Sequence, residues 1–339
     1  MKAVVYRKSL PIDDPQSLLD AELPTPVASA RDLLVKVEAI SVNPVDTKVR
    51  QRVDPAGKDG VLGWDVAGIV IAAGPEASRF KPGDAVWYAG DRSRPGANSE
   101  YHLVDERIVG RKPSTLSMAE AAALPLTTIT AWELMFDRLG IPHGTQGQPA
   151  TLLVIGAAGG VGSMAVQLAR RLTGLTVIGT ASRPETREWV EALGAHHVVD
   201  HAKPLDDEVL AVAPGGVDYV LSLTRTEQHF ATFPRLMKPQ GKIGIIDDPA
   251  ELIDIRLLKA KSISLHWESM FTRSGFHTDD MGEQGHLLGE VANLVDAGVI
   301  RSTMREHLGR IDAANLRRAH ALAESGAAIG KVVLEGWAQ

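Results

Sequence analysis

An apolar stretch at residues 152–155 runs directly into the glycine-rich turn Gly156-Ala-Ala-Gly-Gly-Val-Gly162, and a helical pattern follows from Ser163. A strand, a tight turn and a helix in this order direct backbone N–H groups and the positive end of the helix at one spot. That arrangement suits a pyrophosphate, so the turn predicts a dinucleotide site. A glycine pattern alone is weak evidence for such a site, and its specificity here comes from the strand before it and the helix after it. The alternative is a tight strand-to-helix turn with no ligand.

From residue 152 onward, apolar runs of strand length alternate with helical patterns. Helical stretches such as 185–193 and 227–237 separate most of the strand candidates. Six strands with short connections predict a doubly wound parallel sheet of the α/β class. The strand candidates are residues 152–155, 175–179, 197–199, 217–221, 242–246 and 262–265.

The part of the chain before this sheet has a different sequence pattern. Residues 1 to about 110 read as short strands interrupted by glycine and proline, for example at 32–39 and 66–71. The chain ends near an apolar run at 330–334, which predicts a terminal strand. Because 339 residues exceed what one compact core holds, we expect two domains, with the chain returning to the first of them at its end.

Composition excludes several classes of protein. The formal charge of −6 argues against nucleic acid as a main partner. No run of about 18 apolar residues is present, so no membrane span is expected. The first residues enter a strand-like pattern directly and lack the layout of a signal peptide, which favours a cytoplasmic protein. There are no cysteines, so disulfides and thiolate metal sites are excluded.

The second strand of the sheet should end beside the adenosine ribose of a bound dinucleotide. An NAD site usually has an acidic residue there, roughly 20 residues past the turn, but this chain has no acid before Glu185. Ser182 and Arg183 stand there instead, and a hydroxyl with a guanidinium would hold a 2′-phosphate, which predicts NADPH. Ser182 with Glu185 also reads as a capping box, a role that does not involve the Arg183 side chain. Arg187 is the alternative phosphate ligand.

The glycines of the turn have separable roles. Gly159 is expected to permit the tight turn and the close approach of backbone to phosphate, whereas Gly162 lets the helix pack against the strand. Ser222 and Ile246 follow the fourth and fifth strands, at the carboxyl ends where an open sheet binds its ligand. The turn residues expected at the cofactor are Gly156, Ala158, Gly159, Gly160, Val161 and Gly162.

Four segments together resemble the medium-chain dehydrogenase/reductase superfamily, in its quinone oxidoreductase-like branch. They are Ser41-Val-Asn-Pro-Val-Asp-Thr-Lys48, the turn that ends at Gly162, Leu193-Gly-Ala195 with Val198-Val-Asp-His201, and Gly330-Lys-Val-Val-Leu-Glu-Gly336. Residues 246–250 and 262–268 are similar to a subgroup labelled zinc-type alcohol dehydrogenase-like. The resemblance implies a GroES-like catalytic domain at 1–124 and 268–339, a Rossmann NADPH-binding domain at 125–267, a homodimer, and a place for His201 beside the adenine.

The zinc label conflicts with the residues of this chain. Zinc members hold the metal with a Cys, a His beside a Glu, and a second Cys. Asn43 stands at the first of these positions, Trp64 and Asp65 replace the His-Glu pair, and the last position falls near Leu126. Because a catalytic zinc needs three protein ligands, we expect no metal. Asp65, like Asp46, is expected to hold loops by hydrogen bonds.

Without a metal to polarise a carbonyl, a quinone or an α,β-unsaturated carbonyl compound is the easier hydride acceptor. By resemblance, Asn43 would donate to the substrate oxygen or the nicotinamide, and Thr127 and Thr130 would face the nicotinamide and its ribose. Lys48 replaces a common Tyr, and its ammonium would stabilise an anion or deliver a proton through water. Two alternatives stay open: Asn43 caps a turn, and Lys48 is a solvated surface lysine.

A flat substrate also needs an apolar pocket. The residues expected to line it are Trp64, His266, Trp267, Met270 and Phe271, some of which serve equally well as ordinary core. The leading hypothesis is therefore an NADPH-dependent, zinc-independent reductase of a small carbonyl or quinone substrate. The alternatives are a zinc-dependent alcohol dehydrogenase and a non-catalytic protein that binds NADPH for a structural purpose.

Overall fold

The computed structural model describes residues 1–144 and 149–337. Its contacts divide the chain into unit 1, Met1–Ile129 with Phe271–Gln339, and unit 2, Thr130–Met270. The functional domains expected from the sequence, 1–124 with 268–339 and 125–267, stay a prediction. Their residues 145–148 and 338–339 lie outside the described residues.

Unit 2 contains the parallel sheet that the alternating pattern predicts. Six strands run in the order β11-β10-β9-β12-β13-β14, and every neighbouring pair is parallel. The order reverses beside β9, the strand that enters the glycine turn, which confirms a doubly wound α/β fold. The strands are β9 Thr151–Ile155, β10 Thr176–Thr180, β11 His197–Val199, β12 Val217–Ser222, β13 Met237–Ile245 and β14 Ser264–Trp267.

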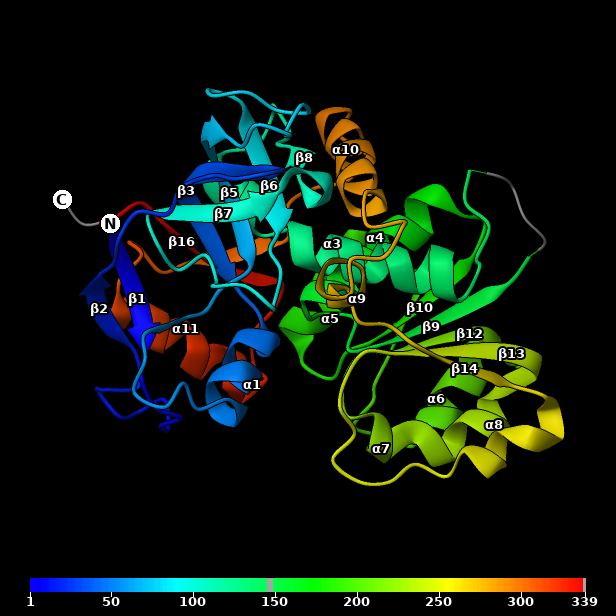
Figure 1. Cartoon of the computed structure of the whole chain (residues 1–339). Helices are drawn as coiled ribbons and strands as arrows, with labels where there is room; N and C mark the ends of the chain where they lie inside the picture. The colour runs from blue at the N-terminus through cyan, green and yellow to red at the C-terminus, as the bar shows by residue number, and fades with distance from the viewer. Residues whose placement is uncertain (145–148, 338–339) are drawn as a thin grey trace. The chain divides into compact units, whose positions relative to one another are not determined.

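Helices cover both faces of this sheet. Figure 1 shows α4 on one face, where it packs against α5, and α6 with α8 on the other face. The helical stretch expected at 227–237 is broken into short pieces because Pro234 has no N–H to continue a helix and instead sits in the first turn of α8. The helices are α4 Gly160–Leu172, α5 Pro184–Leu193, α6 Leu205–Val212, α7 Thr226–His229 and α8 Phe233–Leu236, with a π-helical turn at Glu133–Arg138 and 3-10 turns at Phe230–Thr232 and Ile255–Lys261.

Unit 1 is built on a seven-stranded sheet and a three-stranded sheet. The larger sheet has the order β15-β16-β3-β5-β6-β8, with β7 paired to β3, and the smaller has the order β2-β1-β4. The terminal strand β16 pairs antiparallel with β3, so the chain returns to unit 1 at its end as expected. The strands are β1 Lys2–Tyr6, β2 Leu19–Glu22, β3 Asp32–Val42, β4 Gly60–Val61, β5 Asp65–Ala73, β6 Ala85–Ala89, β7 Tyr101–Asp105, β8 Gly110–Arg111, β15 Met304–His307 and β16 Lys331–Glu335.

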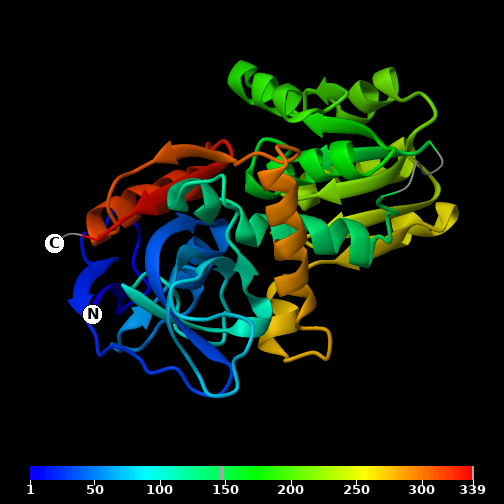
Figure 2. The ribbon, with the colours of Figure 1, turned by 90° about the horizontal axis from the view of Figure 1, so that it is seen from above.

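Helices pack closely on these sheets. The longest, α10, lies against β8 (Figure 2), and a Cβ at its Gly285 would come within 2.4 Å of the Arg107 carbonyl oxygen. Helices α1 and α11 pack together, and the buried Arg50 of α1 forms an ion pair with Glu324 of α11. The helices are α1 Pro44–Arg52, α2 Met118–Ala122, α3 Pro125–Trp132, α9 Phe271–Gly275, α10 Glu283–Asp296 and α11 Ala313–Ser325, with a 3-10 turn at Glu106–Ile108.

The register of the larger sheet brings four strand ends together. Ser41 near the end of β3 pairs with Asp65 at the start of β5, and Asp65 pairs in turn with Ala89 at the end of β6. Val42 pairs with Val332 of β16. Residues that flank these pairs therefore gather at one end of the sheet. None of the helices in the described residues is long and apolar enough to cross a membrane.

Candidate functional site

The glycine turn of unit 2 has its left-handed residue at Gly156, with a φ of +80°. The expectation that Gly159 permits the tight turn is wrong, because Gly159 has a φ of −73° that any residue adopts, and it serves as the N-cap of α4. The Gly156 N–H donates to the Thr180 hydroxyl at 3.1 Å, which ties the turn to the end of β10. Only a glycine takes the Gly156 conformation at little cost.

Gly162 is required for a different reason. A Cβ there would lie 2.3 Å from the Gly156 carbonyl oxygen and 2.6 Å from the Ala157 Cα, closer than real atoms approach. The first turn of α4 thus packs directly on the chain that leaves β9. The first N–H groups of a helix have no acceptor within it, so those of Gly160, Val161 and Gly162 are suited to a phosphate. Together with the close approach of the backbone, this cradle fits a dinucleotide.

The end of β10 carries the residues expected at the 2′-phosphate. Arg183, not Ser182, is the N-cap of α5, and the Arg183 N–H donates to the Thr186 hydroxyl at 3.2 Å. The capping box expected between Ser182 and Glu185 is therefore wrong, because Pro184 occupies the first helical position and sets the start of the helix. Arg183 forms a partly exposed ion pair with Glu185 at 3.4 Å.

Arg187, the alternative phosphate ligand, is engaged elsewhere. Its guanidinium donates to the carbonyl oxygens of Ala181, at 3.3 Å, and of Val198, at 2.8 Å. These bonds tie α5 to the ends of two strands. The Arg183 side chain is 43% exposed, whereas the Arg187 guanidinium is bonded to two backbone carbonyls, and the choice between them as phosphate ligand stays a prediction.

The other strand ends of unit 2 also carry polar groups. His201 lies 3.2 Å from the Thr180 hydroxyl, and burial lowers the pKa of its imidazole. The buried Ser222 hydroxyl is 2.7 Å from that of Thr226, whose hydroxyl donates to Asp247 at 2.6 Å. Ile246 follows β13 and is half-buried, and Thr130 is buried. The sequence reasoning missed Thr226 and Asp247, although both follow strands at their carboxyl ends.

Three buried polar side chains meet at the gathered end of the large sheet in unit 1. Asn43 Nδ2 donates to Asp65 Oδ2 at 2.7 Å, and Lys331 Nζ donates to Asn43 Oδ1 at 2.5 Å. The Lys331 ammonium lies 3.2 Å from Asp65 Oδ2 and donates to the Val42 carbonyl at 2.8 Å. The Ser41 hydroxyl also donates to Asp65, at 2.7 Å. Amide, carboxylate and ammonium thus form a closed triangle of contacts, which we name the Lys331 cluster (Asn43, Asp65 and Lys331).

Burial governs the ionisation of these groups. It lowers the pKa of Lys331, and the nearby Asp65 and Asp46 oppose that change. Burial also raises the pKa of Asp46 to about 7, although the hydrogen bond from the Asn43 backbone and the charge of Lys331 both lower it. Asp46 Oδ2 accepts from the Asn43 N–H at 2.5 Å, at the start of α1. Both aspartates therefore hold chain segments by hydrogen bonds, which confirms the structural role expected for them.

The positions at which zinc members carry ligands do come together here. Asp65 Oδ1 accepts from the Leu126 N–H at 2.7 Å, while Asp65 Oδ2 accepts from Asn43. The donor set does not fit zinc, because it offers one carboxylate, already hydrogen-bonded on both oxygens, an amide, and an ammonium that would repel a cation. Within residues 1–144 and 149–337, no three His, Asp or Glu side chains group as metal ligands.

Sequence reasoning missed Lys331, although a signal was present. It opens a strand whose next three residues, Val332, Val333 and Leu334, are all buried. A lysine at the start of such a strand is expected to reach either solvent or a buried carboxylate. Its partner Asp65 could not be identified from the sequence, because it lies in β5, far away along the chain.

The remaining catalytic candidates occupy different settings. Asn43 is the N-cap residue of α1, as the capping alternative expects, and its side chain takes part in the Lys331 cluster. Thr127 is buried, and its hydroxyl donates at 3.0 Å to the carbonyl of Leu124, the residue just before α3. Lys48 is half-buried on α1. Catalytic roles for these three residues stay predictions.

The expected pocket residues fall into two groups. In unit 1, the Trp64 and Phe271 rings meet edge to face, with centroids 5.7 Å apart. In unit 2, His266 and Trp267 lie on the edge strand β14, Trp267 with 54% of its surface exposed, and Met270 is buried. Their grouping into one pocket stays a prediction.

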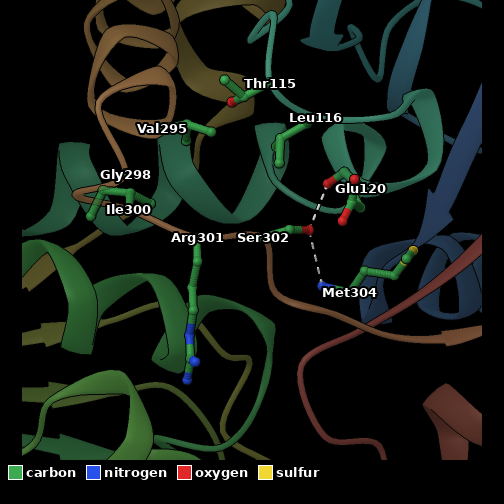
Figure 3. A pocket seen from close by; sticks show the side chains of 9 residues that line it. All are labelled: Thr115, Leu116, Glu120, Val295, Gly298, Ile300, Arg301, Ser302 and Met304. Carbon is green, nitrogen blue, oxygen red and sulfur yellow. Dashed lines mark hydrogen bonds between the residues drawn. The ribbon is translucent and has the colours of Figure 1, made fainter.

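A separate hollow of about 390 Å³ opens in unit 1 beside the end of α10 (Figure 3). Ser302 lies in its wall, where its hydroxyl donates to the Glu120 carbonyl at 2.8 Å and accepts from the Met304 N–H at 3.3 Å. None of the site residues expected from the sequence lines this hollow.

Comparisons with known proteins agree with this architecture. Residues 160–278 match the family model of the zinc-binding dehydrogenases, and residues 29–130 match that of the alcohol dehydrogenase GroES-like domain. A zinc-type alcohol dehydrogenase-like protein of Staphylococcus epidermidis is 38% identical over 336 residues, which cover 98% of this chain and 99% of the relative. These matches confirm the GroES-like and Rossmann folds expected from the resemblance.

Two solved structures extend the comparison. A Rhizobium etli CFN 42 protein assigned to the zinc-dependent alcohol dehydrogenases is 57% identical, with a TM-score of 0.96 over 100% of this chain and 99% of that one. The quinone oxidoreductase of Coxiella burnetii is 26% identical, with a TM-score of 0.81 over 99% of both chains. The sequence and structural likeness, taken with the glycine turn at the switch point of a parallel sheet, shows that this chain belongs to the medium-chain dehydrogenase/reductase superfamily of oxidoreductases, in its quinone oxidoreductase-like branch.

Proposed function

We propose that the protein is an NADPH-dependent reductase of quinones or α,β-unsaturated carbonyl compounds that works without zinc. The observation that carries this proposal is the Lys331 cluster. Its ammonium lies beside the Asp65 carboxylate at the place where zinc members have their ligands, so this carboxylate has a cationic partner without a metal. A conjugated acceptor needs less polarisation than an isolated carbonyl, because its developing charge is delocalised.

The chain's own residues support NADPH as the cofactor. The N–H groups of residues 160–162 would hold the pyrophosphate, with Ser222, Ile246 and His201 at neighbouring strand ends. Ser182 and Arg183 at the end of β10 would hold the 2′-phosphate. When bound, NADPH supplies the hydride.

We propose that residues of unit 1 orient and polarise the substrate. Asp65 and Lys331 engage the Asn43 amide on both its nitrogen and its oxygen, so its orientation is fixed. We assign Asn43 as the donor nearest to the substrate oxygen, and Asp65 and Lys331 as the residues that position it. Lys48, on the helix that Asn43 caps, is the proposed source of the proton. The cytoplasmic location and the homodimer inferred from the sequence belong to the same proposal.

The direct test is NADPH oxidation with p-benzoquinone or an enone such as cinnamaldehyde. We expect saturable turnover that is unchanged by prolonged treatment with EDTA or phenanthroline, and less than stoichiometric zinc in the purified protein. Activity lost to the chelator and restored by zinc would support the zinc-dependent alcohol dehydrogenase instead. Tight NADPH binding without turnover on a broad carbonyl panel would support the non-catalytic alternative.

Cofactor choice is tested by Arg183→Ala. We expect the Kd for NADPH to rise about 10- to 100-fold, because one charge-assisted contact with the 2′-phosphate contributes about 1.5–3 kcal/mol. The Kd for NADH should change little, since NADH has no phosphate there. Calorimetry with both cofactors measures the two values.

The matched control is Arg187→Ala, in the next turn of α5. This change removes two hydrogen bonds to backbone carbonyls, so it should lower the melting temperature and leave the preference for NADPH in place. If the Arg183→Ala variant lost affinity for NADPH and NADH equally, the assignment of the 2′-phosphate to Arg183 would be contradicted.

A further inference from the structure

Arg92 lies at the same sheet end as the Lys331 cluster, in the loop that follows β6. Gly90, at the start of this loop, donates its N–H to the Trp64 carbonyl at 2.8 Å. The Trp64 indole N–H approaches the Asp91 carbonyl at 3.3 Å. Two hydrogen bonds thus tie the start of the loop to Trp64, the residue just before β5.

The Arg92 side chain is held by a ring rather than by a carboxylate. Its guanidinium carbon lies 5.7 Å from the centre of the Phe271 ring, and the Trp64 ring packs against Phe271. Such a cation–π contact is a weak attraction at an exposed site. It orients the guanidinium and leaves its N–H donors, which lie in the plane of the group, available for an acceptor.

Other arginines of unit 1 show what Arg92 lacks. Arg94, two residues away, pairs with Asp32 at 2.7 Å, and Arg107 pairs with Asp105 at 2.8 Å. The carboxylate closest to Arg92 along the chain, that of Asp91, accepts the Ser93 N–H at 2.8 Å. Arg92 is exposed, and no carboxylate among residues 1–144 and 149–337 forms an ion pair with it. A guanidinium positioned over the Phe271 ring, which in turn meets the Trp64 ring, is a combination that suits an anionic, flat ligand.

We propose that Arg92 makes this enzyme selective for conjugated acceptors that carry a carboxylate or a similar anionic group. This inference rests on the proposed function and deepens it by naming the substrate class. The flat apolar part of the substrate packs beside Phe271, which Trp64 supports from its edge. The anionic group accepts two parallel N–H bonds from Arg92. Neutral acceptors are reduced too, but with lower kcat/KM.

The test compares cinnamaldehyde with p-carboxycinnamaldehyde, and p-methylcinnamaldehyde controls for size. We expect the unmodified protein to favour the carboxylate compound by about tenfold in kcat/KM, the effect of one bidentate charge-assisted contact. In Arg92→Ala, this ratio should fall to near one. Arg92→Lys should retain part of it, because a lysine does not form the bidentate pair.

The matched control is Arg171→Ala. Arg171 is an exposed arginine in the last turn of α4, so its loss changes the net charge equally, and the ratio should stay at its original value. An unmodified protein without preference, or an Arg92→Ala protein that keeps the preference, would overturn the inference.

Binding keeps the two proposals separate. If neither aldehyde is reduced, the proposed function fails. The role of Arg92 is then decided by the Kd values of the same compounds, measured by calorimetry in the presence of NADPH. The inference then requires p-carboxycinnamaldehyde to bind about tenfold more weakly to the Arg92→Ala protein than to the unmodified one. An equal Kd in both proteins would overturn it.

Discussion

Replacing Lys331 with methionine is expected to lower the free energy of unfolding by about 3–5 kcal/mol. Methionine has a similar length but no charge, so Asp65 would stay buried with no cation beside it. The Asn43 and Val42 oxygens would each lose a donor as well. Urea denaturation, followed by tryptophan fluorescence, measures the change.

Two controls isolate the buried charge. Lys203→Met removes a lysine whose side chain is 60% exposed and pairs with Glu208 at 3.5 Å, and this change should cost less than about 1 kcal/mol. Adding Asp65→Asn to Lys331→Met removes the uncompensated charge, so the double variant should lose less than the sum of the two single variants. A Lys331→Met protein as stable as the Lys203→Met protein would contradict the ion pair.

The second large effect is expected at the glycine turn. Gly162→Ala should weaken NADPH binding by about 10- to 100-fold, since forcing a methyl into a filled space costs about 1–3 kcal/mol and here shifts the first turn of α4 away from the backbone of Gly156. The Kd from calorimetry measures this loss, and far-UV circular dichroism checks that the protein stays folded.

Gly215→Ala is the matched control in the same unit. A Cβ at Gly215 meets no atom within 4 Å, so this variant should bind NADPH as the unmodified protein does. If Gly162→Ala also bound NADPH with unchanged affinity, the turn would not be the pyrophosphate site.

Local patterns in the sequence were enough to predict the sheet of unit 2. Strand β11 occupies the residues expected for it, and the turn enters α4 directly after β9 as expected. The errors concern single residues whose backbone angles depend on their surroundings. The left-handed residue is Gly156 rather than Gly159, and the N-cap of α5 is Arg183 rather than Ser182. In the second case Pro184 was the usable signal, since proline favours the first position of a helix.

The residue pattern alone was enough to predict the strand, glycine turn and helix of unit 2 and to exclude thiolate zinc ligands. Both follow from residue types and their spacing over a few positions. The Lys331 cluster became visible in the fold alone, because Asn43, Asp65 and Lys331 come from three strand ends far apart in the chain. A buried, charged lysine is stabilised by a neighbouring carboxylate. Which carboxylate lies beside it depends on the register of the strands in the sheet, and a local sequence pattern does not reveal that register.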